Sequence, residues 1–153
     1  MLYKYRENFD KERPVIGIDL SQSMVAIAQN KLGPEATVLV GDMRDLSTIE
    51  SCTAAAIISF FAIHHIDVAD IEKSLREWNR ILVPGGQLVL AAWEGNGPID
   101  YGDTSDVVAL KYSRKQIQAW VEANGFSVTR LTVERIEDLG LDAAYIEASK
   151  LEE

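Results

Sequence analysis

The feature that most constrains the fold is a regular alternation between short apolar runs and amphipathic segments. The first apolar run, 15–19, ends in an acid, and Ser21 then begins a segment with apolar residues at helical spacing. Gly33 and Pro34 end that helix. Comparable apolar runs recur at 37–40, 54–61 and 87–93. The alternation predicts an α/β fold, with a mostly parallel sheet covered by helices on both faces.

The second half of the chain continues this pattern and then departs from it. Asp67 or Asp70 caps a helix that ends before a turn at 84–86, and residues 94–112 read as a long loop. Ser113 and Gln116 match a capping box at the start of a further helix. Two final strands are expected at 126–135 and 143–150. Their short connection predicts an antiparallel terminal pair.

Length and composition restrict the class of protein. The 153 residues suit a single domain over 1–153, and the net charge of -9 argues against nucleic-acid and anionic-membrane partners. Cys52 is the only cysteine, so no intrachain disulfide can form, which favours a reducing, cytoplasmic location. No apolar run in the sequence is long enough to span a bilayer.

Four short motifs, in this order, resemble those of the class I S-adenosylmethionine-dependent methyltransferases, small-molecule branch. The run 16–21 is similar to the family's second-strand motif, and 41–43 is similar to its adenine loop. Residues 57–59 with 63–66 resemble the fourth-strand motif, and 80–86 the turn before the fifth strand. The resemblance implies a Rossmann-like fold with strand order 3-2-1-4-5-7-6 and S-adenosylmethionine as cofactor.

The resemblance also implies roles for the acids that follow the first two strands. Asp19 would accept hydrogen bonds from the ribose hydroxyls, and Leu20 would pack on the adenine ring. Asp42 would accept from the adenine amino group, with Met43 beside it. Each residue also has a purely structural interpretation: Asp19 as a helix N-terminal acid, Asp42 as a turn aspartate, and Leu20 as core.

The acceptor end of the site is expected near the end of the third apolar run. Ser59 and Phe60 would lie beside the methionine part of the cofactor, and His64 or His65 would act as a base or position a small-molecule acceptor. The alternative is that the histidine pair only packs and forms hydrogen bonds. Two adjacent histidines without a third ligand do not match a zinc site.

The segment 1–14 is atypical for the family because it contains no glycine, where a first strand and a glycine-rich loop are expected. It predicts an N-terminally truncated methyltransferase fold in which Leu2, Tyr5 and Phe9 share one helical face, with weak or undetectable cofactor binding. Three arrangements remain open for the missing central strand: direct pairing of its two neighbours, a substitute strand from residues 1–5 or from a second copy, or a marginally stable chain.

Two functions follow from these observations. The first is methyl transfer from S-adenosylmethionine to a small molecule. Loss of the glycine-rich loop would impair this activity. The second is a non-catalytic methyltransferase-like binding module or a truncated fragment. A homodimer formed through exposed strand edges is compatible with either function.

Overall fold

The structure is a computed structural model that describes residues 2–34, 36–99 and 108–152. Contacts within the chain group into two compact units, Met1–Leu46 and Ser47–Glu153.

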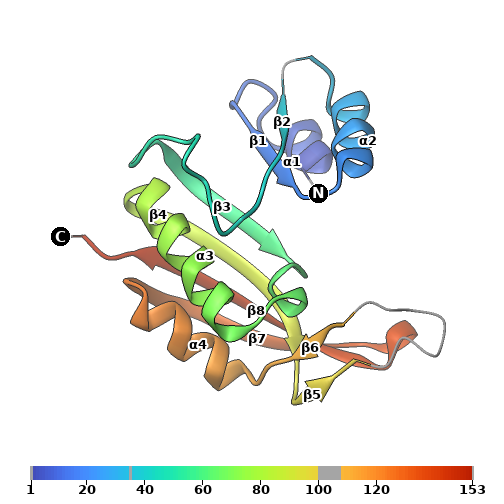
Figure 1. Cartoon of the computed structure of the whole chain (residues 1–153), viewed down its shortest axis with the longest axis vertical. Coiled ribbons are helices and arrows are strands. Elements are labelled where there is room, and N and C mark those ends of the chain that lie inside the picture. The colour runs from blue at the N-terminus through green and yellow to red at the C-terminus, as the bar shows by residue number, and fades with distance from the viewer. Residues whose placement is uncertain (1, 35, 100–107, 153) are drawn as a thin grey trace. The chain divides into compact units, whose positions relative to one another are not determined.

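The N-terminal unit is built on two parallel strands, β1 (Ile16–Asp19) and β2 (Thr37–Val40). Helix α2 (Gln22–Leu32) connects them and packs on both. As predicted, the Ser21 side chain caps this helix by accepting a hydrogen bond from the Met24 amide, and Gly33 ends it with a φ of 79°. The first two predicted strands and the helix between them are therefore confirmed (Figure 1).

Residues ahead of β1 form a short helix, α1 (Leu2–Asn8). The prediction that Tyr5 and Phe9 share a face is confirmed, because their rings stack with centroids 5.8 Å apart. The alternative of a substitute strand from residues 1–5 is wrong, since residues 2–5 are helical.

The C-terminal unit is built on a four-stranded sheet in the order β3-β4-β8-β7. Its strands are β3 (Ala54–Phe60), β4 (Leu82–Glu94), β7 (Phe126–Ile136) and β8 (Leu141–Lys150). Strands β3 and β4 pair in parallel, whereas β8 pairs antiparallel with both β4 and β7. The predicted antiparallel pair at the end of the chain is therefore confirmed; its connection is the single turn η2 (Glu137–Leu139).

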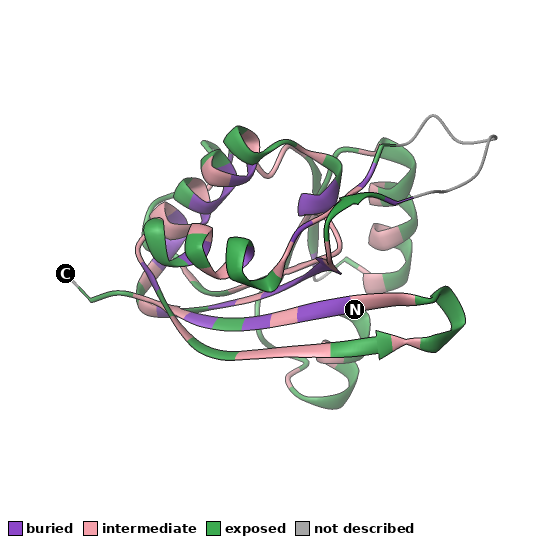
Figure 2. Ribbon diagram, turned by 90° about the horizontal axis from the view of Figure 1, so that it is seen from below, coloured by how far each residue is buried: buried purple, intermediate pink, exposed green. Residues whose placement is uncertain are grey.

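Helices α3 (Val68–Ile81) and α4 (Arg114–Ala123) cover one face of this sheet (Figures 1 and 2). Asp67 caps α3 by accepting from the Asp70 amide, and the predicted capping box of Ser113 and Gln116 begins α4. The stripe on α3 that packs inward contains Ile71, Ser74, Leu75, Trp78 and Ile81. Alternate residues of β4 and β8 meet it, so the core of the unit lies between helices and sheet.

The turn predicted at 84–86 lies inside a strand rather than before one. Ala54 pairs with Leu82 and Ala56 pairs with Gln87, so the residues between Leu82 and Gln87 leave the ladder while the strand continues. Gly85 has a φ of 70°, and a Cβ on Gly86 would lie 2.8 Å from the Val83 carbonyl oxygen. The glycines therefore permit the bend, but the strand begins five residues earlier than predicted.

The predicted loop 94–112 contains regular structure at both ends. Strands β5 (Gly97–Pro98) and β6 (Leu110–Lys111) form a short antiparallel pair, and the Tyr112 amide donates to the Trp93 carbonyl at 3.1 Å. Apolar side chains at Ile99 and Ala109 are buried against Trp93. Residues 100–107 of the predicted loop lie outside the described residues.

Strands β1 and β3 each have a pairing partner within their own unit. Within the described residues of each unit, β1 pairs only with β2, and β3 pairs only with β4. Direct pairing of β1 with β3, the neighbours of the missing central strand, involves both units and stays a prediction. Within its own unit each of these strands keeps one edge without a ladder of backbone hydrogen bonds.

None of the described helices has the length and apolar character needed to cross a lipid bilayer.

Candidate functional site

The N-terminal unit brings Asp19 and Asp42 to the same edge. Asp19 is the last residue of β1, and Asp42 follows β2 by two positions. The Gly41 amide donates to the Asp19 carbonyl at 3.0 Å, which ties the two strand ends together. Because the strands are parallel, both acids lie at their carboxyl end, the edge where open α/β sheets bind ligands.

The Asp19 carboxylate is exposed and only partly engaged. Its Oδ1 accepts a hydrogen bond from the Ser21 amide at 2.8 Å, which fixes the side chain at the entrance to α2. Oδ2 has no hydrogen-bond partner among the described residues. One carboxylate oxygen thus remains able to accept from hydroxyl groups of a ligand.

The Asp42 carboxylate is held by Arg44. The Arg44 guanidinium contacts Oδ2 at 2.6 Å through Nη2, and its Nε lies 2.9 Å from both carboxylate oxygens. The Arg44 amide adds a further hydrogen bond to Oδ1 at 2.9 Å. An amino group of a ligand would therefore have to displace Arg44 before Asp42 accepts from it.

The two apolar residues predicted for the adenine ring differ in exposure. Leu20 is 66% exposed, which contradicts its alternative interpretation as core. Met43 is half-buried in the turn that follows β2. Both are therefore placed beside the acids, Leu20 directly after Asp19 and Met43 directly after Asp42.

Ser59 and Phe60 lie at the carboxyl end of β3 in the C-terminal unit. They are register partners of Leu90 and Ala91, respectively. Successive side chains of a strand point to opposite faces, so the two side chains do not face the same ligand from within the strand. Both are half-buried.

His64 and His65 form a single turn, η1 (Ile63–His65), with ring centroids 3.9 Å apart. His64 is buried, and its Nδ1 has no hydrogen-bond partner among the described residues. Burial, with the neighbouring His65 as a smaller cause, lowers the pKa of His64 to about 4. His65 is exposed, and its Nδ1 lies 3.3 Å from the Val108 carbonyl oxygen. The structure thus places the two histidines in different environments.

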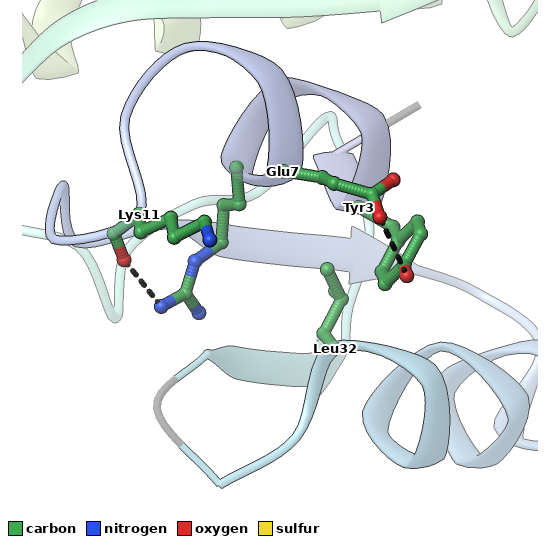
Figure 3. Close-up of a pocket in the computed structure, with 5 residues that line it drawn as sticks. Tyr3, Glu7, Lys11 and Leu32 are labelled. Carbon is green, nitrogen blue, oxygen red and sulfur yellow. Dashed lines mark hydrogen bonds between the residues drawn. The ribbon is translucent and has the colours of Figure 1, made fainter.

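A cavity of about 280 Å³ lies between α1 and the end of α2 (Figure 3). Tyr3, Arg6, Glu7, Lys11 and Leu32 line it. Polar groups of its lining bind one another: the Arg6 guanidinium donates to the Lys11 carbonyl at 2.7 Å, and the Tyr3 hydroxyl donates to Glu7 at 3.3 Å. None of the residues predicted to bind cofactor lines this cavity.

Sequence reasoning missed three residues beside the predicted ones. Arg44 follows Asp42 by two positions. An acid and a base at this spacing in a turn indicate an ion pair, so the sequence contained a signal for this contact. Phe61 has a φ of 54°, which no pattern in the sequence reveals. Tyr145 reaches Phe60 only through the register of the final strands.

Comparison with known proteins points to one family. A family model described as a methyltransferase domain matches residues 1–86. An uncharacterised methyltransferase of Bacillus cytotoxicus is 32% identical over 131 residues, covering 76% of this chain and 61% of that protein. The chain spans between 35% and 61% of the length of the first curated relatives it matches.

Solved structures share the fold. An S-adenosylmethionine-dependent methyltransferase of Methanosarcina mazei superposes with a TM-score of 0.82 at 18% identity, over 94% of this chain and 84% of that one. A 1,6-didemethyltoxoflavin-N1-methyltransferase of Burkholderia thailandensis, solved with its acceptor and S-adenosylhomocysteine, gives 0.78 at 14% identity over 98% and 68%. The Rossmann-like α/β fold is thus shown, and with the family model matching more than half of its length, the chain belongs to the class I S-adenosylmethionine-dependent methyltransferase family.

Proposed function

We propose that this chain binds S-adenosylmethionine through the carboxyl edge of β1 and β2 and serves methyl transfer to a small-molecule acceptor. The observation that carries the proposal is the exposed Asp19 carboxylate at that edge, with Oδ2 open to ribose hydroxyls. The exposed Leu20 side chain supports it, because a 66% exposed leucine beside an acid offers an apolar surface to a purine ring.

Asp42 fits the cofactor less directly than Asp19 does. Since Arg44 occupies its carboxylate, we propose that the adenine amino group takes over part of this ion pair when the nucleoside binds. The ion pair is partly exposed, with Arg44 and Asp42 side chains at 34% and 27%, so solvent can take the place of Asp42 around the Arg44 guanidinium.

The sulfonium supplies an already activated methyl group, and the chain has to position the acceptor and exclude water. Of the two predicted histidines, His65 is the better placed to receive a proton from the acceptor. The Val108 carbonyl can only accept, so the neutral His65 ring donates through Nδ1 and keeps its lone pair on Nε2. His64 is buried and binds a proton only well below neutral pH.

The small-molecule acceptor is supported by two observations. Acidic residues outnumber basic ones by 24 to 15, which disfavours a nucleic-acid acceptor. The Burkholderia thailandensis neighbour acts on a small molecule, and by analogy of fold the same class of acceptor is proposed here.

Calorimetric titration of the chain with S-adenosylhomocysteine tests the nucleoside site. We expect saturable but weak binding. The variant Asp19→Asn keeps the oxygen that accepts a hydrogen bond from the Ser21 amide but removes the charge, and it should bind at least tenfold more weakly. Glu12→Gln, a matched loss of charge at an exposed position of the same unit, should bind as the native chain does. The proposal fails if the chain shows no saturable binding at millimolar ligand, or if both variants bind equally.

A second measurement distinguishes a non-catalytic binding module from an enzyme. Transfer of a labelled methyl group to small-molecule extracts should fall at least tenfold in His65→Gln while S-adenosylhomocysteine affinity stays unchanged. Saturable binding without any transfer would support the non-catalytic function instead.

A further inference from the structure

Four aromatic rings gather where β3 and β4 end in the C-terminal unit. Phe61 and Trp93 have ring centroids 4.4 Å apart, and Tyr145 meets Phe61 edge-to-face at 6.4 Å. Phe60 meets Tyr145 in the same way at 6.1 Å. Only Trp93 is buried; the other three are half-exposed. We call Phe60, Phe61, Trp93 and Tyr145 the aromatic platform.

Backbone conformation brings two consecutive residues into this platform. In an extended strand Phe60 and Phe61 would point to opposite faces of the sheet. Phe61 instead has a φ of 54°, a conformation that bulky side chains rarely adopt, and its amide is held by the Ala91 carbonyl at 2.8 Å. Both rings therefore reach Tyr145. Strain of this kind concentrates at functional sites.

Register places a small residue between two of the rings. Phe60, Ala91 and Tyr145 are successive partners across β3, β4 and β8. Ala91 fills little space between its neighbours and is fully covered. Side chains of this register row alternate with the buried Leu90 and Ile146, which face α3 and α4, so the platform lies on the opposite face of the sheet.

Part of the platform belongs to the hydrophobic core, because Phe61 and Tyr145 pack against the buried cluster formed by Trp93, Ile99, Ala109 and Ala143. Core positions need only apolar volume, whereas here three half-exposed rings are held edge-to-face around one another. The Tyr145 hydroxyl also makes no hydrogen bond among the described residues, so it remains able to bind a polar group of a ligand.

We infer that the aromatic platform binds the acceptor and selects flat, aromatic molecules over saturated ones of the same size. The inference rests on the proposed function, which it makes more specific, since it names the class of acceptor. Aromatic rings attract one another beyond the area that they bury, and a saturated ring of equal size lacks this contribution.

Equilibrium dialysis of the full chain against naphthol and its saturated counterpart decahydronaphthol tests the inference, with and without S-adenosylhomocysteine. We expect naphthol to bind about tenfold more tightly than decahydronaphthol. Tyr145→Leu should reduce this ratio at least threefold, and Tyr145→Phe, which keeps the ring, should preserve it. Trp120→Leu is the matched control, because it removes a ring paired edge-to-face with Tyr112 at 5.0 Å, outside the platform.

Equal binding of the two probes, no binding of either, or an equal loss in Trp120→Leu and Tyr145→Leu would overturn the inference. Thermal unfolding of each variant shows whether it folds, and Phe61→Leu, which removes another ring of the platform, replaces Tyr145→Leu if the latter does not. Titration of the same preparations with S-adenosylhomocysteine reports on the nucleoside site separately. A chain that discriminates the probes but does not bind S-adenosylhomocysteine would therefore refute the proposed function and leave the platform intact.

Discussion

His64 links the structure of a single residue to the stability of the chain. Its pKa is lowered from 6.5 to about 4, first by burial and then by the charge of His65. Between these values the unfolded chain binds a proton that the native chain does not. The contribution of neutral His64 to stability is therefore complete above pH 6.5 and is lost as the pH falls toward 4.

Chemical denaturation at several pH values should show this loss. Between pH 7 and pH 5 we expect the free energy of unfolding to fall by about 2 kcal/mol more in the native chain than in His64→Phe. His65→Phe removes the exposed neighbour and should keep most of the native pH dependence. Equal slopes in the native chain and His64→Phe would show that His64 titrates normally in the folded state.

Individual site residues could be identified from sequence only where position along a strand determines their surroundings. Asp19 and Asp42 follow strands, so their common edge was predictable from the parallel pairing of β1 and β2. Residue type and spacing do not encode local dihedral angles and packing. These determine the ion pair of Arg44 with Asp42, the burial of His64 and the conformation of Phe61.

Strand β3 differs from the usual edge of a sheet. Its sequence, Ala54–Phe60, contains no charged residue and no proline, the usual means of protecting an edge, and Ile58 is 39% exposed. Its composition is typical of an interior strand, although within the described residues of its own unit β3 pairs only with β4. We propose that this edge drives self-association, as the predicted homodimer requires.

Sedimentation velocity over a range of concentrations tests whether the edge of β3 drives self-association. The native chain should form dimers as concentration rises, and Ile58→Lys should shift the equilibrium at least tenfold toward monomer, because a charge opposes strand pairing. Leu139→Lys makes the same substitution at a 60% exposed residue outside the strands and should leave the equilibrium unchanged. A chain that stays monomeric at high concentration, or an equal effect of both substitutions, contradicts this use of β3.

At the scale of elements, the sequence predicted most of the fold. Strand β2 and the caps Ser21 and Ser113 were predicted at their observed positions, because side-chain periodicity and capping chemistry are local properties. The early start of β4 was missed, since a register shift depends on the partner strand. The short pair β5 and β6 was missed because two-residue strands carry no periodicity.

The two units differ in how much they bury. Within the described residues of the N-terminal unit only Ala36 and Leu46 are buried apolar residues, and α2 has none. The C-terminal unit holds the rest of the core, including Leu88, Leu90 and Ile146. Since buried apolar surface stabilises native structure, the N-terminal unit should open more easily than the C-terminal one.

Binding of a cofactor at the edge of β1 and β2 would reduce the difference in stability between the two units. A ligand that binds only the native unit stabilises it by an amount that grows with ligand concentration, about 2.7 kcal/mol at a hundredfold excess over the dissociation constant. The effect should be largest in the unit that holds the ligand, because regions of a protein open locally with different free energies.

Hydrogen exchange with and without S-adenosylhomocysteine therefore tests the central claim, that the carboxyl edge of β1 and β2 holds the nucleoside. The account predicts fast exchange in the peptides over 16–20 and 37–44 without ligand, and at least tenfold slower exchange in both with ligand near saturation. Saturation with ligand that leaves these peptides unchanged and slows exchange only within 54–98 would contradict it.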